Sequence, residues 1–298
     1  MNERLPGLII AGVPKAGTSS IFDWLDDHPK TQGSVPKETC FFMDPDSHAF
    51  RPDFNFGLGL THYPKAFAKT DDPGCLLFEA TPAYIYSRTA LAEIPRLESA
   101  PKCLFVLREP ASQIRSVYHY FSNNWAYIPS EMSFADFLEA SECGSHDFGG
   151  NELARHALDC ADYLPWLQRW RDRLGCDRIK VCLFEDLKRD PLAFMSGIAA
   201  WCGIDPRFYD DYAFEASNES YNVVNRRLHS LNMAIRDRLP KGRAYEFARG
   251  VYRRFNTRPA VKDKTDDAFL RLREKFEVTY DPLEREFGLD LSAWRERG

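Results

Sequence analysis

The sequence predicts an α/β fold of P-loop type, in which a parallel β-sheet is flanked by helices on both faces. Short apolar runs of five or six residues alternate with longer segments that have helical periodicity. Parallel strands need such connections, because the chain must return to the end of the sheet at which the next strand begins, and a crossover helix provides that return. In addition, the first apolar run leads directly into a glycine-containing loop and then a helix. The 298 residues suit one domain spanning 1–298.

The first predicted strand contains Leu8, Ile9 and Ile10, which form a short apolar run with branched side chains. A run that is apolar on both faces is typical of a buried parallel strand. Three later runs have the same character and give the remaining predicted strands, which are Cys75–Glu79, Lys102–Leu107 and Ile179–Phe184.

The helical segments fill the intervals between and after these strands. The first begins after the glycine loop and has Ile21, Phe22, Trp24 and Leu25 at its apolar positions. Pro110 suits the first turn of another helix, where its missing N–H is not needed. The predicted helices cover Ser19–Asp27, Pro110–Ser122, Phe134–Ala140, Ala154–Leu174, Pro191–Cys202, Arg226–Arg238 and Asp266–Phe287. The stretch from Pro36 to Asp72 is predicted to be a long irregular excursion.

Composition indicates an ordinary globular protein. Apolar residues make up 44% of the chain and charged residues 28%. The sequence has neither an apolar run that could span a membrane nor a signal-peptide pattern, so we expect a cytoplasmic protein. Eight scattered cysteines without a CxxC pair favour mostly buried free thiols over a disulfide framework or a metal site.

The net charge of −5 is unevenly distributed. Residues 226–262 contain eleven Lys and Arg residues against two acidic residues, while the rest of the chain is acidic. Such a basic segment suits an anionic ligand, a polyanion or a membrane surface, or else forms a solvated helix face. We expect no nucleic-acid partner.

The loop after the first strand has the composition of an anion site. Backbone N–H groups at a helix N-terminus and the helix dipole both attract phosphate. Gly12 and Gly17 have Walker A spacing, but Thr18 occupies the position of the Walker lysine, and Lys15 lies inside the loop instead. This displacement favours a ligand that binds without a metal ion. Its reacting group would lie at a different place from the reacting phosphate of an NTPase ligand.

A second anion-binding pair follows another predicted strand. Arg108 ends that strand, and Ser116 lies about two helical turns later. A guanidinium group is planar and always charged, which suits it to phosphate. In open parallel sheets, ligands bind beyond the carboxyl ends of the strands. We therefore expect Lys15, Glu79, Arg108 and Glu185 to lie around one crevice.

Together these motifs resemble those of the sulfotransferases that use 3′-phosphoadenosine 5′-phosphosulfate (PAPS), particularly the bacterial and heparan-sulfate type. PKAGTSS resembles the 5′-phosphosulfate loop, and LREPASQIRSVYHYF resembles the 3′-phosphate motif. PKETCFF, EATPAY, LFEDLKRDP and YDPLEREFGLDLSAW resemble further family segments, in order, from about residue 7 to residue 294. The resemblance implies the sulfotransferase fold and sulfuryl transfer from PAPS to a hydroxyl or amine, releasing adenosine 3′,5′-bisphosphate (PAP).

The resemblance also assigns roles to individual residues. It implies a catalytic role for Lys15, Glu38 as the base that accepts the acceptor's proton, and Glu79 as a residue that orients the acceptor or shares that task. His119 and His62 are alternative bases. Lys37 is an acceptor-side cation or a surface lysine. The predicted cofactor-binding residues are Lys15, Ala16, Gly17, Thr18, Ser19, Ser20, Arg108, Ser116, Lys241, Gly242 and Arg243, with the Arg258–Lys262 region as an alternative C-terminal loop. No metal ligands are predicted.

Two positions depart from the family pattern. Ala80 stands where the family has a lysine, and Gln113 stands where an arginine is common. For the adenine slot, the candidates are Trp24, Phe184 and Tyr221. The expected acceptor is a small molecule, and above all a carbohydrate or glycolipid. A P-loop nucleotide kinase or NTPase and a non-catalytic nucleotide- or glycan-binding homologue are the alternatives, and Ala80 favours the second of these.

Overall fold

A five-stranded parallel sheet forms the centre of the protein, as the sequence predicts. The computed structural model describes residues 5–67, 72–125, 127–129, 131–215, 221–223, 257–259 and 266–296. The strands are β1 (Leu8–Gly12), β2 (Thr31–Gly33), β3 (Leu76–Ala80), β4 (Lys102–Leu107) and β5 (Ile179–Leu183), in the order β2-β3-β1-β4-β5. A separate antiparallel pair consists of β6 (Tyr221–Val223) and β7 (Thr257–Pro259).

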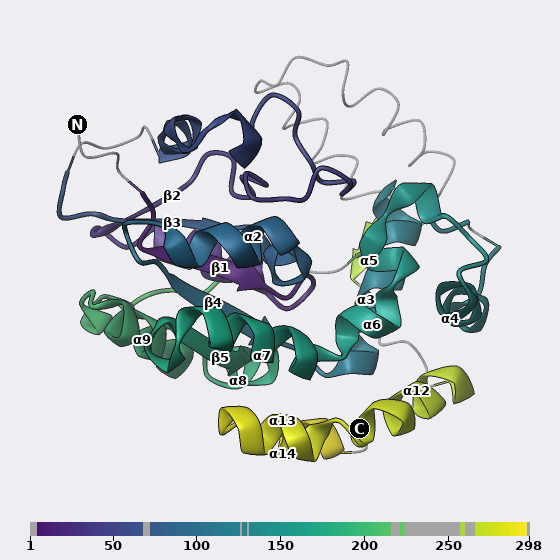
Figure 1. Cartoon of the computed structure of the whole chain (residues 1–298). Coiled ribbons are helices and arrows are strands. Elements are labelled where there is room, and N and C mark those ends of the chain that lie inside the picture. The colour runs from purple at the N-terminus through teal and green to yellow at the C-terminus, as the bar shows by residue number, and fades with distance from the viewer. Residues whose placement is uncertain are drawn as a thin grey trace.

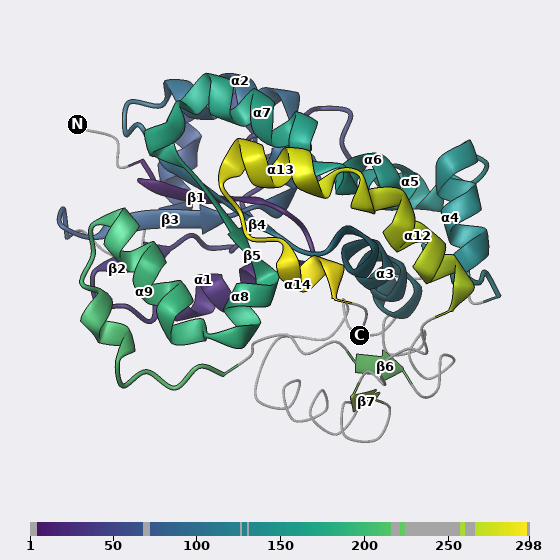
Figure 2. The same cartoon turned by 90° about the horizontal axis from the view of Figure 1, so that it is seen from below.

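Helices cover both faces of this sheet, which explains why its central strand β1 is apolar throughout. On one face lie α1 (Thr18–Asp26), α8 (Phe184–Arg189) and α9 (Pro191–Cys202), and on the other α2 (Arg88–Glu93) and α7 (Tyr163–Leu174) (Figures 1 and 2). All five residues of β1 are buried. Because β1 pairs with β3 and β4, the loop after β1 begins between two neighbouring strand ends.

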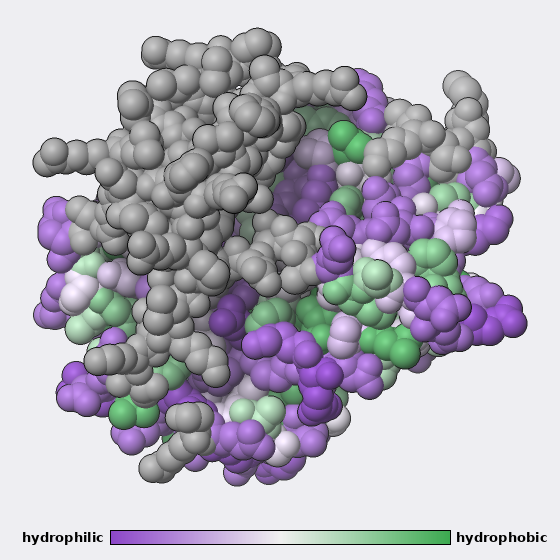
Figure 3. Space-filling view, turned by 180° about the vertical axis from the view of Figure 1, so that it is seen from behind, coloured by the Kyte–Doolittle hydropathy of each residue, from purple (hydrophilic) through white to green (hydrophobic). Residues whose placement is uncertain are grey.

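The remaining helices lie beyond the carboxyl ends of the strands. Several of them gather on one side of the molecule (Figure 1). These helices are α3 (Pro110–Tyr120), α4 (Phe134–Cys143), α5 (Glu152–Arg155), α6 (Ala157–Ala161) and α12 (Asp267–Glu277). The C-terminal α13 (Tyr280–Phe287) packs against α7, and α14 (Ser292–Arg295) follows it. On the face shown in Figure 3, the described surface mixes hydrophilic and hydrophobic side chains, with a hollow between them.

Two of the predicted helices are interrupted in the structure. The predicted helix 154–174 consists of parts of α5, all of α6 and α7, and it breaks at His156 and Asp162, whose backbones are not helical. The predicted helix 266–287 divides into α12 and α13 at Val278 and Thr279, because Pro282 has no N–H to bond Val278 O and its ring would clash with that carbonyl in a continuous helix. The predicted helix Arg226–Arg238 lies outside the described residues. Three-residue β2 is an edge strand that the sequence analysis missed.

Within the described residues, no helix is long and apolar enough to cross a membrane. All eight cysteines are free; Cys143 and Cys176 are exposed, and the others are buried or half-buried. The same part of the chain contains no cluster of three or more side chains suited to hold a metal ion.

Candidate active site

The loop between β1 and α1 brings backbone N–H groups to the edge of a large cleft. Gly17 has φ of +80° and immediately precedes α1, which begins at Thr18. A Cβ at Gly17 would lie 2.8 Å from Leu187 Cδ2 and 3.0 Å from the Phe184 ring, so α8 packs directly on this turn. Both the left-handed backbone and the close contact require glycine here. Gly17 also leaves the first N–H groups of α1 without a capping side chain, as an anion site needs.

Lys15 is held within this loop, close to other cations. Its backbone is left-handed, with φ of +69°, and its Nζ lies 3.9 Å from the centroid of the Tyr120 ring. Desolvation, together with the charges of Arg108 and Lys37, lowers the pKa of Lys15 to about 8. An anion bound at this point would relieve that repulsion, so the electrostatics favour a negatively charged ligand.

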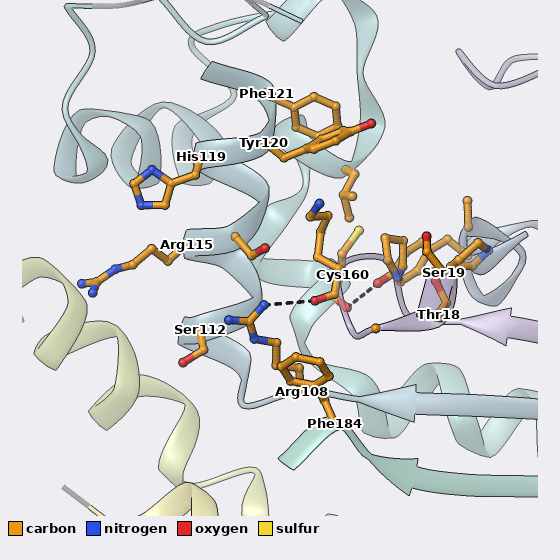
Figure 4. A pocket seen from close by; sticks show the side chains of 18 of the residues that line it. Thr18, Ser19, Arg108, Ser112, Arg115, His119, Tyr120, Phe121, Cys160 and Phe184 are labelled. Carbon is orange, nitrogen blue, oxygen red and sulfur yellow. Dashed lines mark hydrogen bonds between the residues drawn. The ribbon is translucent and has the colours of Figure 1, made fainter. Parts of the chain in front are cut away.

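Arg108 connects the end of β4 to the same loop. Its Nη1 donates to Lys15 O at 3.2 Å, and its guanidinium lies 4.9 Å from the centroid of the Phe184 ring (Figure 4). Tyr163 OH donates to Arg108 O at 2.9 Å and fixes the strand end. Desolvation lowers the pKa of Arg108, an effect that the charge of Glu185 opposes. The two predicted anion-binding motifs thus lie beside each other.

Helix α3 continues this anion-binding surface. Glu109 caps the helix, accepting from Ala111 N (3.0 Å) and Ser112 N (2.7 Å). Ser112, Arg115 and Ser116 line the cleft, in agreement with the predicted place of Ser116. Gln113 does not line it. The Gln113 side chain is fully buried, and Nε2 donates to Pro14 O at 3.1 Å, so it supports the glycine loop from behind.

The loop after β2 brings a second lysine to the first turn of α1. Lys37 Nζ donates to Ser19 Oγ at 2.9 Å and lies 3.4 Å from Glu38 Oε1. Ser34 Oγ (2.9 Å) and Ala80 N (3.2 Å) both donate to Lys37 O, which fixes the backbone at this point. From the sequence, Lys37 is an acceptor-side cation or a surface lysine, whereas in the structure its amine lies at the anion-binding loop. The backbone between β2 and β3 is irregular, so the sequence of this segment has no periodicity that predicts this contact.

Glu38 is in the cleft, but Glu79 is not. The Glu38 side chain lines the cleft and is 51% exposed. Glu79 is fully buried and accepts hydrogen bonds from Thr39 Oγ1 (2.7 Å), Thr81 Oγ1 (2.7 Å), Tyr84 OH (3.2 Å) and Tyr63 OH. Burial raises the pKa of Glu79, which these hydrogen bonds oppose. Glu79 is therefore outside the described lining, and its carboxyl group holds Thr39, the neighbour of Glu38.

The other predicted carboxylate and the histidines have different places. Glu185 lines the cleft, but its oxygens accept from Glu109 N (3.2 Å) and Trp294 Nε1 (2.9 Å), so it joins the strand end to α14. His119 lines the cleft. His62 is half-buried, its Nδ1 lies 3.4 Å from Lys65 Nζ, and it is outside the described lining, which argues against its role as a base.

The structure describes only some of the residues that are predicted to bind the nucleotide. Trp24 and Phe184 both line the cleft. Ser20 also lines it, whereas Ala16 is fully buried under the loop. For Tyr221 only the backbone is described, in β6. Lys241, Gly242 and Arg243, and the basic segment as a whole apart from the backbone of 257–259, lie outside the described residues.

Comparison with known proteins gives a single family. A family model for the sulfotransferase domain matches residues 5–280. In Homo sapiens, bifunctional heparan sulfate N-deacetylase/N-sulfotransferase 2 is 26% identical over 225 residues, which are 71% of this chain and 24% of that protein. Human heparan sulfate glucosamine 3-O-sulfotransferase 3B1 is 25% identical over 213 residues, 70% of this chain and 50% of the relative. The chain thus spans half or less of these relatives.

A solved structure covers almost all of the chain. The crystal structure of a sulfotransferase from Alicyclobacillus acidocaldarius matches 98% of this chain and 100% of its own, with a TM-score of 0.71 at 21% identity. At that identity the match establishes the shared fold, in agreement with the parallel sheet described above. Neither comparison favours the kinase alternative.

Proposed function

The chain belongs to the sulfotransferase family, and on that premise we propose that it transfers a sulfuryl group from PAPS to a hydroxyl or amine of an acceptor. The acceptor we propose is a carbohydrate or glycolipid, which the two heparan sulfate sulfotransferases among its relatives support. One observation carries the proposal. The Arg108 guanidinium is hydrogen-bonded to Lys15 O at 3.2 Å, so two anion-binding motifs far apart in sequence share one cleft.

The residues around the loop fit a donor with two separated anionic ends. The N–H groups at the start of α1, with Thr18 and Ser19, would hold the 5′-phosphate, and Arg108 with Ser116 would hold the 3′-phosphate. The left-handed Gly17, whose Cβ position is blocked by α8, supports close approach of the backbone to phosphate. PAPS supplies a sulfuryl group that is joined to its 5′-phosphate through a bridging oxygen.

The chemistry requires a stabilised leaving oxygen and a deprotonated acceptor. The bond between sulfur and the bridging oxygen breaks, and a bond from sulfur to the acceptor oxygen or nitrogen forms. We assign Lys15 to the charge that develops on the bridging oxygen, and Lys37 to the sulfuryl oxygens, because its amine lies 2.9 Å from Ser19 Oγ. Glu38 accepts the acceptor's proton. The scheme assigns charge stabilisation to lysines and backbone N–H groups, and none to a metal ion.

Glu79 acts on this chemistry from behind the site. Its buried carboxyl group holds the Thr39 hydroxyl at 2.7 Å, and Thr81 Oγ1 in turn accepts from Cys40 N at 3.3 Å. These contacts fix the backbone on the C-terminal side of Glu38. We therefore propose that Glu79 positions the loop that carries the base, and does not itself touch the acceptor.

Calorimetric titration with PAP tests the proposal. We expect metal-free binding, and a loss of about 10- to 150-fold in affinity for Arg108→Ala, because a hydrogen bond to a charged group contributes about 1.5–3 kcal/mol. Arg189→Ala is the matched control, since Arg189 pairs with Asp186 outside the cleft lining. No binding of PAP, or a preference for ATP with magnesium, would refute the assigned donor.

A further inference from the structure

The cleft has a second part, which is lined by described residues from 40–49, 81–87, 121–127 and 151–160 and by Trp166. The whole cleft has a volume of about 1990 Å³, more than the roughly 300–1,000 Å³ that is usual for a small-molecule site. We call its second part the distal lobe. Its described lining includes His48, Tyr86, Trp125, Glu152, Asp159 and Trp166.

Positive charge is segregated along the described lining of this cleft. Its Lys and Arg residues all belong to the glycine loop, the loop after β2, the end of β4, α3, α8 or α12, and these are Lys15, Lys37, Arg108, Arg115, Lys188 and Arg273. The described lining of the distal lobe includes no Lys or Arg, but it does include the carboxylates of Glu152 and Asp159. A polyanionic acceptor would place its own charges beside these carboxylates, and a like-charge contact in an interface costs several kcal/mol.

Aromatic rings in the lobe are held in fixed orientations. The Tyr86 and Trp166 rings lie 5.3 Å apart, edge to face. Their polar atoms are already bonded to backbone oxygens: Tyr86 OH donates to Cys160 O, and Trp166 Nε1 to Asp159 O, both at 3.0 Å. The Arg169 guanidinium also lies 5.1 Å from the centroid of the Trp166 ring, although Arg169 is outside the described lining. The ring surface that this guanidinium leaves open to the cleft is apolar. Trp125, which is 43% exposed, stacks on Tyr127, and both of these rings also line the cleft.

Hydrogen-bond acceptors belong to the same part of the lining. Glu152 Oε2 accepts from Ser47 Oγ at 2.9 Å and lies 3.6 Å from His48 Nδ1, and its side chain remains 40% exposed. Asn151 Nδ2 and His48 Nε2 are 3.0 Å apart, which fixes the imidazole. The Asp159 side chain is 81% exposed. Exposed carboxylate oxygens and aromatic rings in the same part of the lining match a ligand that offers hydroxyl donors on one side and C–H groups on the other.

We propose that the distal lobe binds an uncharged glycoside, whose sugar ring packs on Trp166 and Tyr86 while its hydroxyls donate to Glu152 and Asp159. This inference rests on the proposed sulfuryl transfer and specifies its acceptor. It separates this chain from relatives whose names specify heparan sulfate, which is a polyanion.

Acceptor binding to the protein saturated with PAP tests the proposal without requiring turnover. The probes are cellotetraose, a heparin-derived tetrasaccharide of the same length, and octyl glucoside below its micelle concentration, each titrated with NMR detection. We expect the two neutral glycosides to bind more tightly than the heparin fragment. Tighter octyl glucoside would indicate a glycolipid, and tighter cellotetraose a free glycan.

Two variants connect the binding to the lobe. Trp166→Ala should weaken the neutral probe about tenfold, since loss of ring packing costs about 1.5 kcal/mol, and should leave PAP affinity unchanged. Glu152→Lys should weaken the neutral probe and strengthen the heparin fragment. Glu139→Lys, on exposed α4 surface outside the described lining, should do neither.

The outcomes separate this inference from the proposed function. PAP binding combined with preference for the heparin fragment, or with no binding of either neutral glycoside at the highest concentration titrated, overturns the distal-lobe inference alone. Unchanged affinity of the neutral probe in Trp166→Ala also overturns it. Loss of PAP binding in the unmodified protein refutes the sulfuryl-donor site itself.

Discussion

Replacing Lys37 by alanine should weaken PAPS much more than PAP. The two nucleotides differ by the sulfuryl group, so a side chain that contacts only that group affects only PAPS. Lys37 Nζ lies at Ser19 Oγ (2.9 Å), at the first turn of α1, where the 5′ end of the donor is proposed to bind. The Lys37 charge also contributes to the lowered pKa of Lys15, so the two amines are near neighbours.

The structure sets the size of this effect. A hydrogen bond to a charged group contributes about 1.5–3 kcal/mol to binding. The Lys37 side chain is 22% exposed and lies near Glu38, and both solvent and that carboxylate reduce its effect on an anion. We therefore expect the lower end, about 1.5–2 kcal/mol, which is about 10- to 30-fold in the dissociation constant for PAPS. PAP affinity should change less than about threefold.

The measurement compares both nucleotides on one protein preparation, without acceptor, by calorimetry. kcat should fall with PAPS affinity or further, because charge on the sulfuryl oxygens and the leaving group must be stabilised during transfer. Lys65→Ala is the control, since Lys65 is exposed, lies near His62 and is outside the described cleft lining. Equal losses for PAPS and PAP would assign Lys37 a merely structural role, and unchanged PAPS affinity would refute its contact with the sulfuryl group.

Three further predictions concern the same site. Because desolvation lowers the pKa of Lys15 to about 8, its ammonium is lost as pH rises through that value, and kcat/KM should fall about tenfold per pH unit above it; a profile flat to pH 10 would contradict this role. Glu38→Gln should lower kcat by about 10²–10⁴-fold with nearly unchanged PAP affinity, and a large affinity loss with normal kcat would instead place Glu38 at the nucleotide. Gly17→Ala should destabilise the fold by about 1–2 kcal/mol in thermal unfolding and weaken PAP, because φ is +80° and the new Cβ meets Leu187, and unchanged stability would contradict that contact.

The buried strands were predictable because their apolar runs are continuous. The predicted bounds of β4 agree with the structure, and those of β1, β3 and β5 differ from it by at most two residues. β2 has three residues at a sheet edge, too short for a pattern to register. The strand ends then brought Lys15 and Arg108 together, as the rule for parallel sheets predicts.

Side chains on irregular backbone were not predictable in the same way. Glu79 follows the strand pattern, but whether its carboxyl group faces the cleft or the interior depends on Tyr63 and Thr39, which are distant in sequence. The place of Lys37 likewise depends on the path of the chain between β2 and β3. Neither segment has a periodicity from which these contacts follow, so only tertiary structure assigns them.

The position of Lys37 also changes how Ala80 should be interpreted. In the sequence, a missing family lysine at Ala80 favours a homologue that binds nucleotide without transferring a group. Ala80 N donates to Lys37 O at 3.2 Å, so these two positions are adjacent across the end of β3. The side chains of residues 37 and 80 therefore leave the backbone at neighbouring positions. The amine of Lys37 extends from there to Ser19. If Lys37 supplies that charge, Lys37→Ala combined with Ala80→Lys should regain transfer that Lys37→Ala alone loses. Failure of this rescue, with PAP binding intact, would make Ala80 an argument for the non-catalytic alternative again.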